Sequence, residues 1–407
     1  MKIASHVLAG LAAGLTVAML AGCGNGTHAA PTEKTARAQA PTEKTARALA
    51  PSEKTARALS PAEKTARALA PTEKTAAPAR ALLDPSGRAV LVEPANLIQL
   101  SSNAGQSWSM LRLPAAPASG QSIAIAGGAI AALTVDAHGM ALQRTADSGR
   151  SWQARPVPLS MPTDQADLAV SPDGSRVAVL ASVQGSANDG NTPELFTGST
   201  GGALVAQTAP ASGSIAWAGN RLLLAGGPLN SRLYSSDDNG ASWVSRPVGG
   251  VIAARFNLDP NTPSIGTPLV SSAGSVLLPV TVHAGRSASV QFYRSSNANS
   301  FTASVRVPLT SQLGSGAMAV VSMAGPGRYL VAEPGSTALH LVTDSGQLTI
   351  TPTGLPGPVD SLSFADAEHG LAQVTVRSCN GSKQSCASTV EVLRTSDGGH
   401  SWTNTGS

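Results

Sequence analysis

A regularly spaced set of acidic side chains is the feature of this sequence that most resembles a reactive site. Asp147, Asp238 and Asp397 each stand third in the same eight-residue motif, Ser/Thr-x-Asp-x-Gly-x-Ser-Trp, and Asn103 takes that place in a fourth copy. Repeated carboxylates could bind calcium, or could act as general acids and bases. Each copy offers too few oxygen atoms to fill a calcium coordination sphere. We therefore interpret these side chains as parts of turns.

The other residues of the eight-residue motif also suit a tight hairpin. Asp and Asn side chains accept hydrogen bonds from nearby backbone N–H groups, and Ser and Thr do so more weakly. Glycine adopts a positive φ without a Cβ clash. A tryptophan at the end buries a large apolar face. Four of the five tryptophans end such a motif, namely Trp108, Trp152, Trp243 and Trp402.

Three weaker copies lie in the long gaps between the clear ones. They are Thr197–Leu204, Ser295–Phe301, which is one residue shorter, and Val342–Leu348, which contains Asp344. The seven copies then recur on average every ~49 residues, which matches the ~40–50 residues of a four-stranded propeller blade. Short β-branched runs such as Val177–Leu180 separate the copies, and no long amphipathic helix follows residue 80. The pattern predicts an all-β, seven-bladed β-propeller over residues 81–407, with whole blades at both ends. Six or eight blades are less favoured.

The motif resembles the Asp-box, or BNR, repeat of sialidase-like β-propellers. In that family the repeat closes the hairpin between the third and fourth strands of each blade, on the face opposite the catalytic mouth. The resemblance therefore implies a structural role for Asp147, Asp238, Asp344 and Asp397. The segment Phe364–Ala372, which precedes the last motif, also resembles propellers of the photosystem II stability/assembly-factor type. Those proteins are non-enzymatic assembly chaperones, so this resemblance implies a protein that binds partners.

An enzymatic function has less support from the residues. Sialidases use several arginines, a Tyr–Glu nucleophile pair and an acidic Asp, and their Arg-Ile-Pro sequence is absent here. Tyr234 and Tyr293 lie on expected third strands, away from the centre of a ring. The histidines show no metal-ligand spacing, and no nucleophile elbow or phosphate-binding loop occurs. We nominate no catalytic residue, metal or cofactor. A glycan-binding or glycoside-hydrolysing, exo-sialidase-like propeller is the alternative.

The first 80 residues are expected to lie outside the propeller. Residues 1–22 are largely apolar and, with Cys23, end in Leu-Ala-Gly-Cys, which resembles a bacterial lipobox; we expect a lipoprotein signal peptide and lipidation of Cys23. Residues 31–80 are five near-identical decamers, each beginning with proline. Because proline interrupts a helix, we expect a disordered or short-helical tether over residues 23–80. As a flexible coil it would span roughly 40 Å, enough to hold a propeller away from a membrane.

The distribution of charge argues against a nucleic-acid partner. The whole chain has a formal net charge of +4, and the decamers alone contribute a net +5, because each holds one Glu, one Lys and one Arg. The propeller is therefore close to neutral, without the basic surface that nucleic acids attract. We expect an extracytoplasmic, lipid-anchored monomer whose propeller binds a protein or a cell-wall polymer.

Two long loops between expected second and third strands are the candidate binding sites. Their polar tips hold Asn188, Asp189 and Asn191 in one loop, and Asn380 and Lys383 in the other. Loops on a rigid scaffold often carry function, although a plain surface role stays open. Cys379 and Cys386 flank the second tip, and in an exported chain we expect them to form a disulfide. Arg144, Arg294 and Arg394 each precede a motif, and we interpret them as struts between blades, with a basic docking ring as the alternative.

Overall fold

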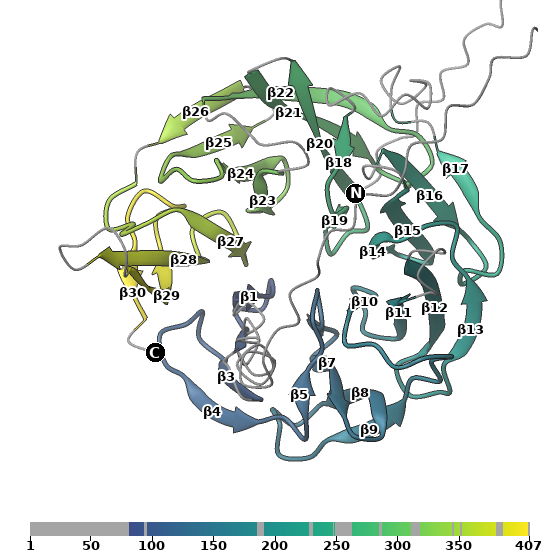
Figure 1. The fold of residues 1–407 in the computed structure, drawn as a ribbon. Coiled ribbons are helices and arrows are strands. Elements are labelled where there is room, and N and C mark those ends of the chain that lie inside the picture. Colours follow the sequence, from purple (N-terminus) through teal and green to yellow (C-terminus); the bar gives the residue numbers. More distant parts are fainter. Residues whose placement is uncertain are drawn as a thin grey trace, which may run out of the picture. The chain divides into compact units, whose positions relative to one another are not determined.

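The computed structural model describes residues 81–92, 96–184, 191–227, 231–246, 248, 263–284, 287–310, 318–343, 346–350, 352–379 and 386–405. All regular secondary structure in these ranges is β-strand, arranged in seven separate sheets. The sheets form the seven blades of a β-propeller, so the predicted fold is confirmed (Figure 1). Within the same ranges there is no helix of the length and hydrophobicity that a membrane crossing requires. The expected signal peptide, lipidation site and tether lie outside the described residues.

Each blade consists of consecutive antiparallel strands, ordered from the central channel to the outer edge, and the inner strand is interrupted in blades 2 and 5. Blade 1 comprises β1 (Ala81–Leu83), β2 (Ala89–Val92), β3 (Leu97–Ser101) and β4 (Ser109–Arg112). Blade 2 comprises β5 (Ala116–Pro117), β6 (Ile123–Ala126), β7 (Ala129–Asp136), β8 (Gly139–Thr145) and β9 (Gln153–Pro156). Blade 3 comprises β10 (Ala166–Val170), β11 (Arg176–Gln184), β12 (Asn191–Ser199) and β13 (Val205–Thr208). Blade 4 comprises β14 (Gly213–Ala218), β15 (Arg221–Gly226), β16 (Arg232–Ser236) and β17 (Val244–Arg246).

Blades 5 to 7 complete the ring. Blade 5 comprises β18 (Ser264–Ile265), β19 (Leu269–Val270), β20 (Val276–Ala284), β21 (Ser287–Ser295) and β22 (Thr302–Leu309). Blade 6 comprises β23 (Val320–Met323), β24 (Arg328–Ala332), β25 (Leu339–Thr343) and β26 (Gly346–Ile350). Blade 7 comprises β27 (Val359–Phe364), β28 (Gly370–Cys379), β29 (Cys386–Thr395) and β30 (Thr403–Asn404). We call the end of the ring with the first-to-second and third-to-fourth hairpins the motif face, and the opposite end the loop face.

The eight-residue motif forms the whole loop between the third and fourth strands in blades 1, 2, 4 and 7. The strand pairs that flank these loops are Leu100 with Ser109, Arg144 with Gln153, Ser235 with Val244, and Arg394 with Thr403. In blade 5 the corresponding loop is one residue shorter, as the weaker copy Ser295–Phe301 predicts. In blade 3 the loop is also one residue shorter, although the copy Thr197–Leu204 has the full length, because Thr197 itself pairs with Val205. In blade 6, Thr343 pairs with Gly346, so only two residues connect the strands. Asp344 is one of these two and lies outside the described residues.

Blade 2 shows how the motif holds its shape. The Thr145 hydroxyl accepts a hydrogen bond from Gly149 N (2.8 Å) and donates one to Asp147 (2.7 Å). The same Asp147 carboxylate accepts bonds from the backbone N and the hydroxyl of Ser151, at 3.0 and 2.6 Å. Ser148 and Gly149 both adopt the left-handed conformation that the turn requires (φ 59° and 84°). Corresponding bonds occur in blades 1, 4 and 7.

The motif glycine brings each hairpin against the preceding blade. A Cβ atom at Gly149 would collide with Leu111, which belongs to β4 of blade 1. A Cβ atom at Gly240 would lie 2.8 Å from Leu195 in blade 3, and one at Gly399 would lie 2.9 Å from Leu330 in blade 6. The absence of a side chain therefore permits close packing between blades, in addition to permitting the turn.

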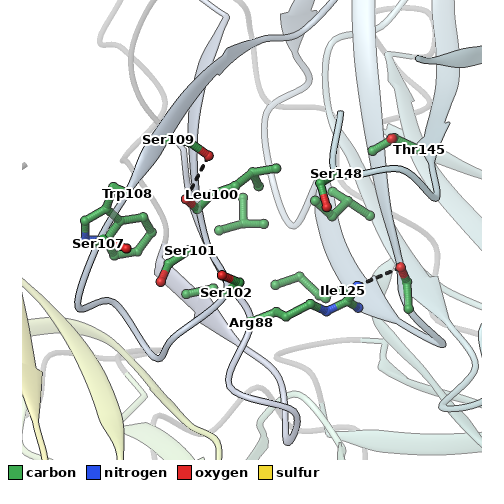
Figure 2. Close-up of a pocket in the computed structure, with 14 residues that line it drawn as sticks. Arg88, Leu100, Ser101, Ser102, Ser107, Trp108, Ser109, Ile125, Thr145 and Ser148 are labelled. Atoms are coloured by element: carbon green, nitrogen blue, oxygen red, sulfur yellow. Dashed lines mark hydrogen bonds between the residues drawn. The ribbon is translucent and has the colours of Figure 1, made fainter. Parts of the chain in front are cut away.

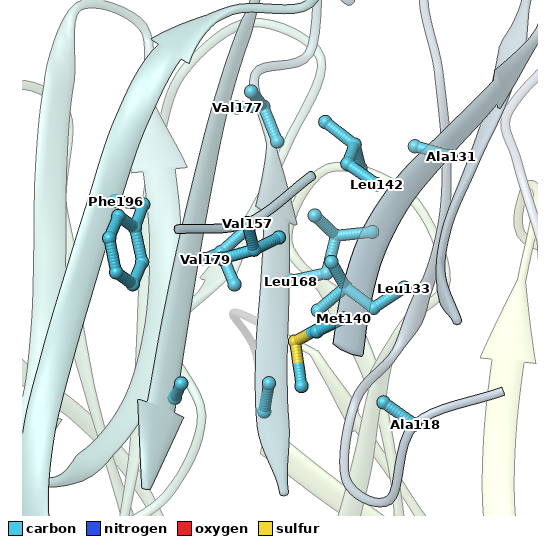
Figure 3. Close-up of a cluster of buried hydrophobic side chains, with 12 residues drawn as sticks. Ala118, Ala131, Leu133, Met140, Leu142, Val157, Leu168, Val177, Val179 and Phe196 are labelled. Carbon is cyan, nitrogen blue, oxygen red and sulfur yellow. The ribbon is translucent and has the colours of Figure 1, made fainter. Parts of the chain in front are cut away.

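The large apolar clusters also lie between blades. Figure 3 shows the cluster between blades 2 and 3, where Leu133, Leu142 and Phe196 are buried. The motif tryptophans extend such clusters: Trp152 joins the one between blades 1 and 2, Trp243 that between blades 3 and 4, Trp402 that between blades 6 and 7, and Trp108 that between blades 7 and 1. Each indole thus covers the junction with the preceding blade.

Blade 7 packs against blade 1 and closes the ring without sharing a strand with it in the described part of the chain. Their apolar contact includes Leu83, Leu91 and Leu371. Ser363 Oγ accepts a hydrogen bond from Leu83 N (2.8 Å) and donates one to Leu83 O (3.2 Å). The first and last blades are each built from one continuous segment, as predicted.

Substitution of the motif glycine should cost more than the turn alone explains. We expect Gly149→Ala to destabilise the propeller by about 1–3 kcal/mol more than Gly274→Ala, because the new methyl group collides with Leu111. Gly274 is the matched control, since it has a similar φ (81°) and its surroundings leave open space for a methyl group. Urea unfolding of both variants measures the difference. In a Leu111→Ala background the excess cost should disappear, and its persistence would contradict this packing role.

Candidate binding surfaces

A central channel runs between the inner strands of the ring. Its motif-face half has a volume of about 730 Å³ and its loop-face half about 700 Å³. Gln121, Thr267 and Leu269 line both halves, so the two are continuous. Small and aliphatic side chains from β6, β10, β14, β23 and β27 form much of the wall. The channel is therefore a hollow large enough to accommodate part of a ligand.

Charged side chains are sparse along the described channel wall and already have partners. Asp84 forms an ion pair with Arg88 (Oδ2 to Nη2, 3.1 Å) and accepts a hydrogen bond from Ser86 N (2.9 Å). Asp360 accepts a hydrogen bond from the Thr375 hydroxyl (2.6 Å). Glycoside hydrolysis needs two opposed carboxyl groups that face the substrate. Asp84 and Asp360 are instead engaged in local turns and strands, and we assign neither a catalytic role.

The loop-face half of the channel exposes apolar side chains. Met318 and Val390 line it and are 38% and 48% exposed. Val320 and Leu362 lie in the same wall and are partly buried. Exposed apolar side chains that line a hollow are characteristic of a site for another macromolecule or ligand. These side chains, which we call the channel mouth, form our candidate binding surface among the described residues of the loop face.

The motif carboxylates do not converge on any site. Hydrogen bonds from Ser151 lower the pKa of Asp147 to about 2, and those from Ser242 lower the pKa of Asp238 to about 2. At Asp397 burial opposes this effect, but the bonds from Ser401 still bring the pKa to about 2. A general acid needs a pKa near the working pH, so these groups are unsuited to that role. Within the described ranges no three or more His, Cys, Asp or Glu side chains gather as a metal site.

The loop tips predicted as binding sites fall largely outside the described residues. These are Asn188, Asp189, Asn380 and Lys383, whereas the backbone of Asn191 pairs with Gln184 in the hairpin of β11 and β12. The flanking strands are longer than the sequence suggests, because pairing continues to Gln184 in blade 3 and to Cys379 in blade 7. Both hairpins point to the loop face, which is also the side of the channel mouth.

Arginines that the sequence did not single out connect neighbouring blades on the motif face. Arg88 Nη1 donates to Gly128 O in blade 2 (2.6 Å), and Arg176 Nη1 donates to Asn220 O in blade 4 (3.1 Å). Arg221 Nη1 donates to Asn297 O in blade 5 (2.7 Å). Each arginine follows a glycine-containing turn at the start of a second strand, a pattern that was available in the sequence.

Among the third-strand arginines, Arg294 makes the expected contact with the next blade. Its guanidinium lies 5.1 Å from the ring centre of Tyr329 in blade 6, within cation–π range. This contact supports the interpretation of Arg294 as a strut. Arg88, Arg176 and Arg221 also connect neighbouring blades, from the starts of second strands.

Glu333 and His340 form a buried pair in blade 6 that no sequence pattern predicted. His340 Nε2 lies 2.6 Å from Glu333 Oε1, and the backbone N of Thr310, which follows blade 5, donates to the same carboxylate at 3.0 Å. The two side chains are 0% and 3% exposed, so a substrate has no access to them. We interpret the pair as a polar connection between blades 5 and 6.

A smaller pocket of about 260 Å³ lies between blades 1 and 2 on the motif face (Figure 2). Aliphatic side chains, including Leu100 and Ile125, form part of its lining. Arg88 and Trp108 line it as well, together with several serine hydroxyls. The pocket therefore combines an apolar lining with a guanidinium, an indole and small polar groups.

The backbone positions of the two blade 7 cysteines are paired across the hairpin of β28 and β29. Cys379 and Cys386 are direct partners in the antiparallel register. Such partners have Cα atoms ~4.5–5.5 Å apart, which lies within the range of disulfides. We expect the intact mass of the exported protein to rise by about 2 Da on reduction, as one disulfide requires. A Cys379→Ser variant should show no such change, and an unchanged mass in the unsubstituted protein would contradict the pairing.

Comparisons with known proteins identify no family for this chain. No protein-family model matches the sequence, and no curated protein matches it. Among solved structures, YCF48 from Cyanidioschyzon merolae is 14% identical over 73% of this chain and 88% of its own, with a TM-score of 0.48. YCF48 bound to D1 peptide is 15% identical over 73% and 91%, with a TM-score of 0.49. A GH74 xyloglucanase from Xanthomonas campestris is 15% identical over 80% and 44%, with a TM-score of 0.36.

Proposed function

We propose that this chain is a lipid-anchored protein of the cell envelope whose propeller docks a protein partner and performs no catalysis. The observation that carries this proposal is the channel mouth, where Met318 and Val390 are exposed beside a hollow of about 700 Å³. Solvent-exposed apolar side chains that gather at a concave surface favour burial against a partner. The partner's apolar side chains would replace water at this mouth.

The chemistry of the channel supports docking over turnover. Asp84 and Asp360 are committed to an ion pair and to a hydrogen bond, respectively. The wall otherwise presents mainly small apolar and hydroxyl-bearing side chains. Such a surface offers shape and apolar contact but little acid–base chemistry. We therefore favour docking over the alternative, a glycoside-hydrolysing propeller.

We also assign the eight-residue motif to the Asp-box class of propeller repeats. Its position between third and fourth strands and its internal Asp–Ser hydrogen bonds support this assignment. In such a repeat the aspartates maintain the hairpins, which agrees with the low pKa of Asp147 and Asp238, caused by hydrogen bonds from the motif serines. Partner binding is then expected at the channel and the loops, and the motif aspartates are expected to have no direct role in it.

Acidic substitutions at the channel mouth should weaken partner capture. We expect Met318→Asp and Val390→Asp each to reduce in-cell crosslinking of the partner at least tenfold, because docking would bury a carboxylate in an apolar contact. Val244→Asp is the matched control, since Val244 is 52% exposed but lies on an outer strand of blade 4. Quantitative mass spectrometry of captured proteins measures the effect.

Two outcomes would count against this proposal. Equal capture by the mouth variants and the Val244→Asp control would remove the channel mouth as the docking surface. Hydrolysis of a panel of fluorogenic glycosides by the purified protein would favour the glycosidase alternative, provided that a channel variant such as Asp360→Asn abolishes it.

Removal of the lipidation site should release the protein from membranes. We expect Cys23→Ala to move the protein from the membrane fraction to the soluble extracytoplasmic fraction, because one acyl-modified cysteine would otherwise provide the anchor. Fractionation with antibody detection measures this. A Cys379→Ser variant keeps Cys23 and serves as the control. Membrane retention of the Cys23→Ala variant would show that the anchor lies elsewhere.

A further inference from the structure

We propose that the pocket between blades 1 and 2 is a slot for an aromatic side chain, of tryptophan size, from a protein partner. This slot is distinct from the surface of the proposed function, because the pocket lies on the motif face and the channel mouth lies on the loop face. An equivalent place in the same ring supports the assignment. At the junction between blades 3 and 4, the chain supplies its own tryptophan.

The two junctions share the same backbone frame, by which we mean a two-residue turn on the inner hairpin and an arginine of the preceding blade that donates to it. At the first, a two-residue turn joins Ala126 to Ala129, and its second carbonyl, Gly128 O, accepts a hydrogen bond from Arg88 of the preceding blade (2.6 Å). At the other, a two-residue turn joins Ala218 to Arg221. Its second carbonyl likewise accepts a bond from the preceding blade, here from Arg176 (3.1 Å). The two arginines therefore occupy corresponding positions.

One side chain differs between the two frames. Ile125 and Trp217 correspond, because each stands one pair before the turn on the inner strand. Trp217 is 2% exposed, and the Arg176 guanidinium lies 5.7 Å from the centre of its indole. At the other junction the smaller Ile125 lines a pocket of about 260 Å³ together with Arg88 (Figure 2). The backbone turn and the arginine that accompany Trp217 are therefore present here, but isoleucine replaces tryptophan at the corresponding position.

The chemistry of the pocket fits such a guest. Arg88 can cover an aromatic face as Arg176 does, and cation–π contacts favour this arrangement. Leu100, Ile125 and Ile130 offer apolar contact on the inside. Ser102 and Ser148 are exposed at the rim, where their hydroxyls can accept an indole N–H or bind a peptide amide. Tryptophan anchors in pockets of this kind dominate many protein interfaces.

Trp217, which fills the corresponding position between blades 3 and 4, suggests the test. We expect N-acetyl-tryptophanamide to cause saturable shifts of the Ile125 and Ile130 methyl signals in NMR spectra of the full-length protein, and N-acetyl-leucinamide to bind at least tenfold more weakly. Ile125→Trp should fill the slot as Trp217 does and weaken binding of the probe at least tenfold. Val244→Trp is the control, because it adds an indole on an exposed outer strand and should bind the probe like the unsubstituted protein.

Other results of these experiments would contradict the proposed tryptophan slot. An absence of saturable shifts at Ile125, or equal binding by the Ile125→Trp variant, would overturn it. Binding of free indole without binding of N-acetyl-tryptophanamide would show a site for small aromatic molecules, and the assignment to a protein partner would be wrong. If Ile125→Trp fails to fold, the methyl shifts of the unsubstituted protein decide the question alone. Partner capture through Met318 and Val390 is measured separately, so either proposal can fail while the other stands.

Discussion

The fold depends on close packing between neighbouring blades. A four-stranded sheet alone leaves apolar faces in water, and stacking successive sheets buries them. In this ring the motif hairpin secures that stacking, because its glycine contacts a leucine of the preceding blade and its tryptophan covers the same junction. The hydrogen bonds around Asp147 keep the hairpin in the shape that makes both contacts. The conspicuous aspartates therefore determine the geometry of the loop.

Contacts between blades also determine where a ligand can be accommodated. Arginine bridges tie adjacent blades on the motif face, and the pair of Glu333 and His340 with Thr310 ties blade 6 to the end of blade 5. Among the hollows that the described residues leave are the channel and the gap beside Ile125, where a smaller side chain occupies the position that Trp217 fills at the junction between blades 3 and 4. The two surfaces that we propose for partner binding thus lie where the packing of the ring is incomplete.

The sequence predicted the architecture because its motif is local and repeated. Copies such as Thr145–Trp152 contain every residue that their own turn needs, so blade number and hairpin position followed from spacing. The channel mouth could not be predicted in this way, because Met318 and Val390 are far apart in the sequence and line the same hollow only through the stacking of blade 7 against blade 6. The correspondence between Ile125 and Trp217 was hidden for a similar reason, since it depends on strand register in blades that lack close sequence similarity.

The way in which the ring closes has a mechanical consequence. The described chain enters the ring at Ala81, in the short inner strand β1, which pairs with β2 through three residues. Blade 1 meets blade 7 through side-chain packing and the bonds between Ser363 and Leu83, with no strand exchanged between them in the described part. A pulling force transmitted from the amino-terminal side would load this seam before any other junction. The seam would then part first, and the remaining blades would stay stacked as an open arc.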